Sequence, residues 1–232
     1  MLKKTLGLFS TTLLASTTLL GAGGVFAGEV VPSPDKAETP ITAELTIEDP
    51  EKPTPPTDPD QGGGDDSTEI IGLFGIAYAP SQLSAKEMLN NNSEEQRIAL
   101  AKDNKTKYNV GVQDKTRKND QSWSLKAQLS WTGEDSKYMQ GTTISATGGN
   151  VKENVNGKLQ DLTNSEVTTA ATNLNIGQES QVEVMKSTKG ATMNGVYNYQ
   201  FSDPELVIPT PDSVASGSYT GNITWNLSNV ME

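Results

Sequence analysis

The sequence contains neither cysteine nor histidine among its 232 residues. Without cysteine there is no disulfide framework and no thiolate nucleophile. Without histidine there is no Ser-His-Asp or Cys-His catalytic group, no His-bearing zinc site, and no side chain naturally poised for proton transfer at neutral pH. Only carboxylates, lysine or tyrosine would be left to an enzyme. The sequence therefore predicts a protein that is not an enzyme and uses no metal or cofactor.

Aromatic residues and positive charge are also scarce. Aromatics make up 6% of the chain and hydrophobic residues 34%, both low for a compact domain, so part of the chain is expected to lie outside a packed core. Lysine and arginine number 18 against 29 acidic residues, which gives a net charge of −11. This acidity disfavours nucleic acid as a partner, because phosphate binding needs a basic surface. It equally disfavours simple electrostatic adhesion to anionic polymers or lipids.

The sequence has one long apolar run, at its N-terminus. Lys3 and Lys4 precede the apolar residues 6–20, and Val25-Phe26-Ala27 supplies small residues at the positions before a cleavage site. The run is short for a membrane span and its end is rich in glycine, which disfavours an anchor or a buried helix. We therefore expect residues 1–27 to be a cleaved signal peptide and the mature protein to be secreted, with no membrane-embedded segment.

Proline and acidic residues dominate residues 28–70, so this stretch is expected to be extended and solvated. Residues 28–40 are predicted to be a disordered acidic segment. Residues 41–48 differ, because Ile41, Ala43, Leu45 and Ile47 alternate with polar residues as in a short strand. If that strand joins a sheet formed by later residues, the domain covers residues 41–232 and residues 49–69 are a long Pro/Asp/Gly-rich excursion within it.

Beyond residue 70 the pattern is mainly that of short strands separated by Gly, Asn, Asp and Pro. An all-β, sandwich-like domain of short antiparallel strands is predicted, with a long Pro/Asp-rich loop and minor helical turns. The helical turns are expected within residues 81–101, where Ser93 and Gln96 resemble a capping box. A strand at 142–147 is expected to end at Gly148-Gly149-Asn150. Further strands are predicted at residues 70–78, 108–112, 151–159, 181–186, 195–201 and 205–208.

Two segments alternate more strictly than the rest. Within residues 122–131 one face carries Trp123, Leu125, Ala127, Leu129 and Trp131, and within residues 219–228 one face carries Tyr219, Gly221, Ile223, Trp225 and Leu227. Period-two alternation predicts one buried face and one solvated face. The tryptophans are then either core residues that bury large apolar area or sugar-stacking residues in a groove, and both roles fit a tryptophan with one exposed edge.

The pair Trp123-Ser124-Leu125 and Trp225-Asn226-Leu227 resembles the two motifs of the WxL surface-protein family of low-GC Gram-positive bacteria. Residues 45–48, 74–78 and 108–114 are similar to other parts of that family, so the resemblance covers nearly all of the chain after residue 27. It implies non-covalent attachment to peptidoglycan at the cell-wall surface. Other surface proteins or host matrix proteins are alternative partners. The implied wall-binding residues, which equally fit a core role, are Trp123, Leu125, Tyr219, Trp225 and Leu227.

Three weaker patterns favour solvated surface over chemistry. Residues 58–69 have part of a calcium-loop spacing, but glycine occupies one ligand position and prolines exclude an entering helix. The carboxylate pairs Glu94-Glu95 and Glu134-Asp135 lie in polar, surface-like stretches, so a solvated face is favoured over glycosidase chemistry. A small basic group lies on a predicted loop and consists of Lys115, Arg117 and Lys118. It would suit an anionic wall polymer, although an ordinary loop is the simpler interpretation.

Overall fold

The computed structural model describes residues 33–48, 50–57, 65–101 and 105–230. The chain divides by its contacts into two units, residues 1–46 and residues 47–232. Residues 33–48 form no helix or strand and their side chains are exposed. The strand predicted at residues 41–48 is not found among the described residues. The signal peptide predicted at residues 1–27 lies outside the described residues.

The larger of two antiparallel sheets follows the order β1-β2-β4-β11-β6-β7, with β3 added to β11 and β9 added to β6. Its long central strand β11 pairs with β4 on one side and with β6 on the other. The strands of this sheet are β1 (Asp65–Ser67), β2 (Phe74–Pro80), β3 (Gln96–Ala99), β4 (Lys107–Asp114), β6 (Thr143–Val155), β7 (Lys158–Gln160), β9 (Leu174–Ile176) and β11 (Gly195–Ile208).

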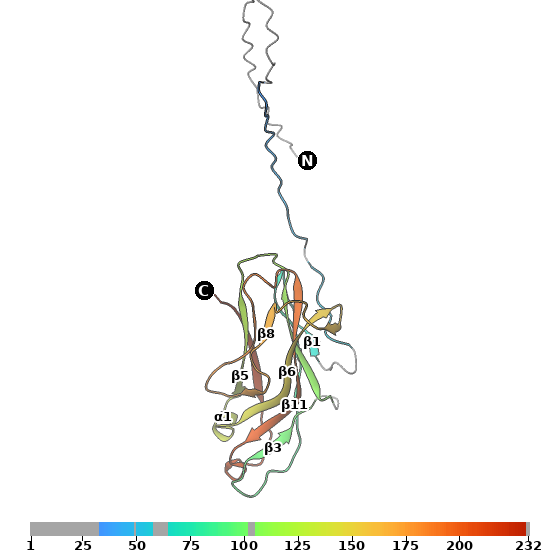
Figure 1. The fold of residues 1–232 in the computed structure, drawn as a ribbon. Helices are drawn as coiled ribbons and strands as arrows, with labels where there is room; N and C mark the ends of the chain where they lie inside the picture. The colour runs from blue at the N-terminus through green and yellow to red at the C-terminus, as the bar shows by residue number, and fades with distance from the viewer. Residues whose placement is uncertain (1–32, 49, 58–64, 102–104, 231–232) are drawn as a thin grey trace, which may run out of the picture. The chain divides into compact units, whose positions relative to one another are not determined.

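The smaller sheet has the order β12-β5-β10-β8. It consists of β5 (Trp123–Trp131), β8 (Val167–Thr169), β10 (Val182–Ser187) and β12 (Gly221–Asn229). In Figure 1, β5 and β8 lie in one layer and β6 and β11 in the other. Two short helical turns, α1 (Asp135–Tyr138) and η2 (Pro211–Ser213), lie in connections between strands. No helix in the described part of the chain is long and apolar enough to span a membrane.

One hydrophobic core lies between the two sheets. The larger sheet contributes aromatic side chains such as Tyr108, Tyr199 and Phe201, and the smaller contributes Trp123 and Leu125, all of them buried. The Tyr108 and Phe201 rings lie 5.8 Å apart, and those of Tyr199 and Phe201 lie 6.1 Å apart. A few large rings thus supply much of the buried apolar area, which compensates for the low overall content of hydrophobic residues. The prediction of an all-β fold is confirmed.

Two local predictions between residues 81 and 155 are wrong. Gln96, predicted to cap a helix, begins strand β3, and its side-chain amide instead donates to the Met88 carbonyl, 2.8 Å away. Ile98 is buried opposite Leu206 of β11, so pairing with a partner strand overrides the local helical signal. The glycines at 148 and 149 do not end the strand at 142–147, because β6 runs unbroken through them along an irregular register with β11.

The prolines of residues 50–57 predicted a solvated segment, but the structure shows these residues partly buried. Pro56 is buried, and the Thr57 amide donates to the Gly157 carbonyl at 3.2 Å in the β6–β7 hairpin. Asn154 Nδ2 donates both to the Thr54 carbonyl, at 2.9 Å, and to the Tyr78 hydroxyl, at 2.8 Å. This part of the Pro-rich excursion is therefore held on the domain by backbone hydrogen bonds that composition alone does not predict.

Candidate functional site

The two Trp-x-Leu motifs lie on neighbouring strands. Strands β5 and β12 pair along their whole lengths without a register shift, so that Leu227 is opposite Leu125 and Trp225 is opposite Ala127. Both motifs direct their Trp and Leu side chains toward the core, where small Ala127 leaves room beside the Trp225 ring. The alternation of the two sequences therefore describes one continuous apolar surface made from segments about a hundred residues apart.

Trp123 is a core residue. Its side chain is fully buried and its ring lies 6.1 Å from that of Tyr197. The indole Nε1 donates to Thr192 Oγ1 at 3.0 Å, and that hydroxyl donates to Asp114 Oδ2 at 2.7 Å. Thr116 Oγ1 donates to the other Asp114 oxygen, also at 2.7 Å. With its ring enclosed and its only polar atom bonded, Trp123 has no surface left for a ligand, and buried Leu125 is likewise a core residue.

Trp225 has a different environment. It is half-buried, and its ring lies 6.1 Å from Phe201 across the core. The indole N–H has no hydrogen-bond partner within the described residues. Its outer side lines a groove of about 440 Å³, which we call the edge groove, together with Thr68, Glu69, Ile70, Ile71, Phe74, Gly75, Ile76 and Ala79. Leu227 follows on the same face and is also half-buried.

Tyr219 lies beside an aromatic residue that the sequence did not single out. Its ring is 6.3 Å from that of Tyr138 in α1, whose side chain is 49% exposed. Asp135 Oδ2 accepts a hydrogen bond from the Thr220 amide at 2.8 Å, which holds α1 against the residues that precede β12. Partial burial, with smaller effects of Tyr138 and Asp135, raises the pKa of Tyr219. We call Tyr138 and Tyr219 the tyrosine pair. Sequence periodicity could not find Tyr138, because a single helical turn has no pattern.

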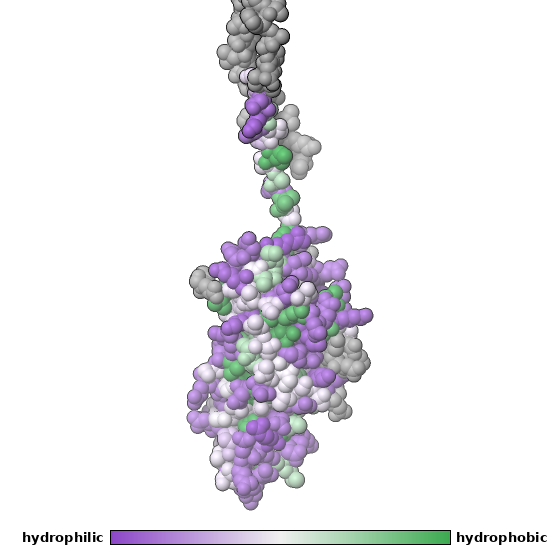
Figure 2. Space-filling model, in the orientation of Figure 1, coloured by the Kyte–Doolittle hydropathy of each residue, from purple (hydrophilic) through white to green (hydrophobic). Residues whose placement is uncertain are grey.

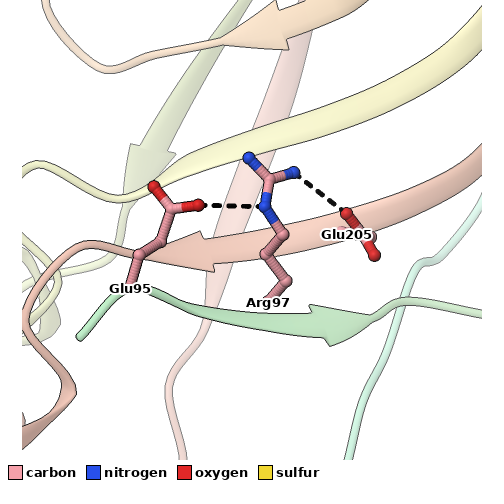
Figure 3. A network of polar contacts seen from close by, with 3 residues as sticks. All are labelled: Glu95, Arg97 and Glu205. Carbon is pink, nitrogen blue, oxygen red and sulfur yellow. Dashed lines mark hydrogen bonds and ion pairs between the residues drawn. The ribbon is translucent and has the colours of Figure 1, made fainter. Parts of the chain in front are cut away.

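Three of the carboxylates singled out in the sequence, Glu95, Glu134 and Asp135, make ion pairs or hydrogen bonds on the surface. Arg97 lies between Glu95 and Glu205 and bonds both, at 2.9 and 3.1 Å (Figure 3). These two carboxylates raise the pKa of the Arg97 guanidinium, so it stays charged at all relevant pH values. Glu134 pairs with Lys137 within α1. Such exposed ion pairs contribute little to stability.

Neither of the remaining patterns forms a metal or catalytic site in the described residues. No cluster of three carboxylates suited to a metal ion is found among them, and residues 58–64 of the calcium-like spacing lie outside them. Asp65, from the same spacing, instead accepts from the Asn109 amide and side chain, at 3.0 and 2.9 Å. Lys118 lines a shallow polar pocket of about 480 Å³ with Lys189, and Lys115 and Arg117 lie in the same β4–β5 loop.

Comparison with known proteins gives one family. No curated protein and no solved structure matches the chain. A family model described as "WxL domain surface cell wall-binding" matches residues 33–230, which include both Trp-x-Leu strands, the edge groove and the tyrosine pair. The match covers well over half of the sequence. The chain therefore belongs to the WxL family of cell-wall-binding surface proteins.

Proposed function

We propose that this protein attaches non-covalently to peptidoglycan on the outside of a Gram-positive cell and catalyses no reaction. The observation that carries the proposal is the family match over residues 33–230, in which the two motif strands form one paired ladder. The absence of cysteine and histidine from the sequence supports a binding role. So do the carboxylates of Glu95 and Glu134, which are held in exposed ion pairs.

We assign the sugar contact to the tyrosine pair rather than to the motif tryptophans. Trp123 is fully enclosed, and substituting it would test folding instead of binding. Tyr138 presents nearly half of its side chain to solvent beside Tyr219, and an aromatic face with a hydroxyl at its rim suits the C–H-rich face and the hydroxyls of a sugar ring. Figure 2 shows a mostly hydrophilic face, on which apolar residues occur only in small groups.

Sedimentation with purified sacculi tests both parts of the proposal. The exported protein is expected to sediment with sacculi, and Tyr138→Ala and Tyr219→Ala are expected to weaken binding while leaving the circular dichroism spectrum unchanged. Met193→Ala, at another exposed apolar residue, serves as the matched control and should bind as the parent does. If the parent stays in the supernatant, peptidoglycan binding is wrong. If the parent binds and both tyrosine variants bind as well as the parent, the sugar contact has been assigned to the wrong surface.

Two further parts of the proposal have simple tests. Export requires the signal peptide, so the N-terminal sequence of protein recovered from the cell surface should begin at Gly28.

Absence of catalysis predicts that the protein leaves no clearing on a gel containing peptidoglycan. A cleared band that disappears when Glu134 or Glu95 is replaced by Gln would overturn it.

A second hypothesis makes the chain a subunit of a surface protein complex or an adhesin for host matrix proteins. The observation that favours it is the exposure of large apolar side chains outside the strands, Ile41 at 90% and Leu45 at 89%. Exposed apolar residues on an extended segment suit a protein partner better than a hydrated glycan. Co-purification of neighbouring surface proteins, or binding to immobilised collagen or fibronectin, would favour this role.

A further inference from the structure

Strand β12 is an unprotected sheet edge. It lies at the end of the smaller sheet, and no strand in the described part of the chain pairs with its second side. Natural edge strands are usually short, charged, bulged or interrupted by proline, which prevents pairing with other chains. Strand β12 has nine residues, Gly221–Asn229, with no charged residue, no proline and no register shift against β5. Its free backbone groups are therefore available to another strand.

The edge groove lies beside this free strand. Between Trp225 of β12 and Phe74 and Ile76 of β2, it provides about 440 Å³ with a largely apolar lining. Ile71 on its rim is 92% exposed. Half-buried Trp225 and exposed Ile71 show that the core is incompletely covered on this side of the domain. A strand added to β12 would place every second side chain over the groove.

A segment of the same chain has the matching pattern. Residues 41–47 alternate apolar and polar side chains, with Ile41 and Leu45 exposed and Ile47 37% exposed, yet they form no strand. Their single charge, Glu44, lies on the polar side of the alternation. The family match begins at residue 33 and so includes this segment. It is thus a strand-like sequence that forms no strand among the described residues.

We propose that residues 41–47 of one copy pair with the free edge of β12 in a second copy. Ile41, Ala43, Leu45 and Ile47 would cover the second copy's edge groove, while the polar residues between them would continue the exposed face that carries Asn222 and Thr224. The partner is a second copy because each chain holds both a strand-like donor, residues 41–47, and an acceptor, the free edge of β12. One donor and one acceptor per copy give head-to-tail association. The proposal is independent of how the wall is bound.

Sedimentation velocity of the exported protein, over about 1 to 100 µM, tests the association. Leu45→Lys disables the donor and Ile71→Lys disables the groove; both positions are exposed in the single chain, so neither change should affect folding. Met88→Lys, at a residue 82% exposed and outside both elements, is the matched control. The parent and the control should form dimers and larger species with rising concentration. Each disabling change should lower the association constant about tenfold or more.

Mixing the two disabled variants gives the sharpest result. Leu45→Lys still carries a working groove and Ile71→Lys still carries a working donor, so an equimolar mixture should form dimers that grow no further. A parent that stays monomeric over the whole range, a Leu45→Lys variant that associates normally, or a mixture that stays monomeric would each overturn the proposal. If the parent is monomeric and Leu45→Lys lowers the melting temperature, residues 41–47 pack on the domain of their own chain. That result would also overturn the proposal.

Discussion

At the scale of single residues, the three tryptophans differ in what their indole N–H groups do. Trp123 donates to Thr192 and Trp131 donates to Thr142 Oγ1, at 2.9 Å, whereas Trp225 has no partner among the described residues. A buried donor that loses its acceptor, or an acceptor that loses its donor, costs more than an exposed one, because water cannot replace it. The same residue type therefore stabilises the fold in one motif and leaves an open surface in the other.

Replacing Trp123 by phenylalanine should lower the free energy of unfolding by about 1 to 4 kcal/mol, because it leaves part of the ring volume empty and removes the hydrogen bond to Thr192. Urea denaturation measures the change. Trp225→Phe is the matched control, and its cost should be smaller, since no hydrogen bond is lost and the site is half-buried. Equal losses at the two positions would contradict the different roles.

Gly111 has a strict steric requirement. A Cβ atom at this position would lie 2.3 Å from the Tyr78 ring, and the Tyr78 hydroxyl is fixed by Asn198, at 2.9 Å, and by Asn154. The ring cannot move aside without breaking these bonds, so Gly111→Ala should destabilise the fold by about 1 to 3 kcal/mol. Thermal unfolding checks this, with Gly217→Ala as control, since a Cβ there meets nothing within 4 Å.

Buried tyrosines make stability depend on alkaline pH. Burial raises the pKa of Tyr78, Tyr197 and Tyr199 above the ordinary value of 10.0. Above about pH 10 the unfolded chain loses these protons while the folded chain keeps them, so stability is fully present below pH 10 and falls as pH rises beyond it. In Tyr78→Phe the slope of unfolding free energy against pH above 10 should be shallower by about 1.4 kcal/mol per unit. An unchanged slope would show that Tyr78 ionises in the folded state.

At the scale of elements, the Pro-rich excursion is tied to the β6–β7 hairpin through one side chain. Asn154 donates to the Thr54 carbonyl and the Tyr78 hydroxyl, and its Oδ1 accepts from the Gly157 amide at 2.8 Å. It therefore joins three segments at a position that is almost completely buried. Four of residues 50–57 are prolines, which have no backbone N–H, so the position of this run depends largely on donors from other elements that bond its carbonyls.

Asn154→Ala should release residues 50–57 and lower the free energy of unfolding by about 1 to 3 kcal/mol, because three partners lose their bonds, two of them buried. Limited proteolysis should then cut within residues 50–57 faster than in the parent. Asn175→Ala, at an exposed position on β9, should change neither quantity. Unchanged proteolysis in Asn154→Ala would show that other contacts hold the excursion.

At the scale of the whole molecule, one core joins both sheets, so residues 65–230 should unfold as a single cooperative unit. All three tryptophans lie in the smaller sheet, on β5 and β12, whereas most strands belong to the larger one. Tryptophan fluorescence and far-ultraviolet circular dichroism should therefore give coincident transitions in urea. Two separated transitions would mean that the sheets unfold independently.

Residue patterns predicted much of the fold. Strict alternation in β5 and β12 needed no partner to be recognised, because a side chain every second residue defines the buried face locally. The all-β class and several strands, such as β4 and β10, followed from the same reasoning. Of the candidate site, the sequence identified Trp225 and Tyr219. It could not distinguish their partial burial from the full burial of Trp123, because alternation shows which face a side chain lies on and not how deeply it is buried.

The sequence by itself determined the strictly alternating strands, β5 and β12; the tertiary structure decided what the weaker patterns become. Residues 93–101 carry a helical signal and residues 41–47 carry a strand pattern, yet residues 96–99 pair with β11 as a strand and residues 41–47 form none. Tyr138 similarly became a candidate only when the Asp135 contact placed α1 beside Tyr219. The physical reason is that a strand's hydrogen bonds are made to another segment, often a hundred residues away, so the partner and not the local sequence completes it.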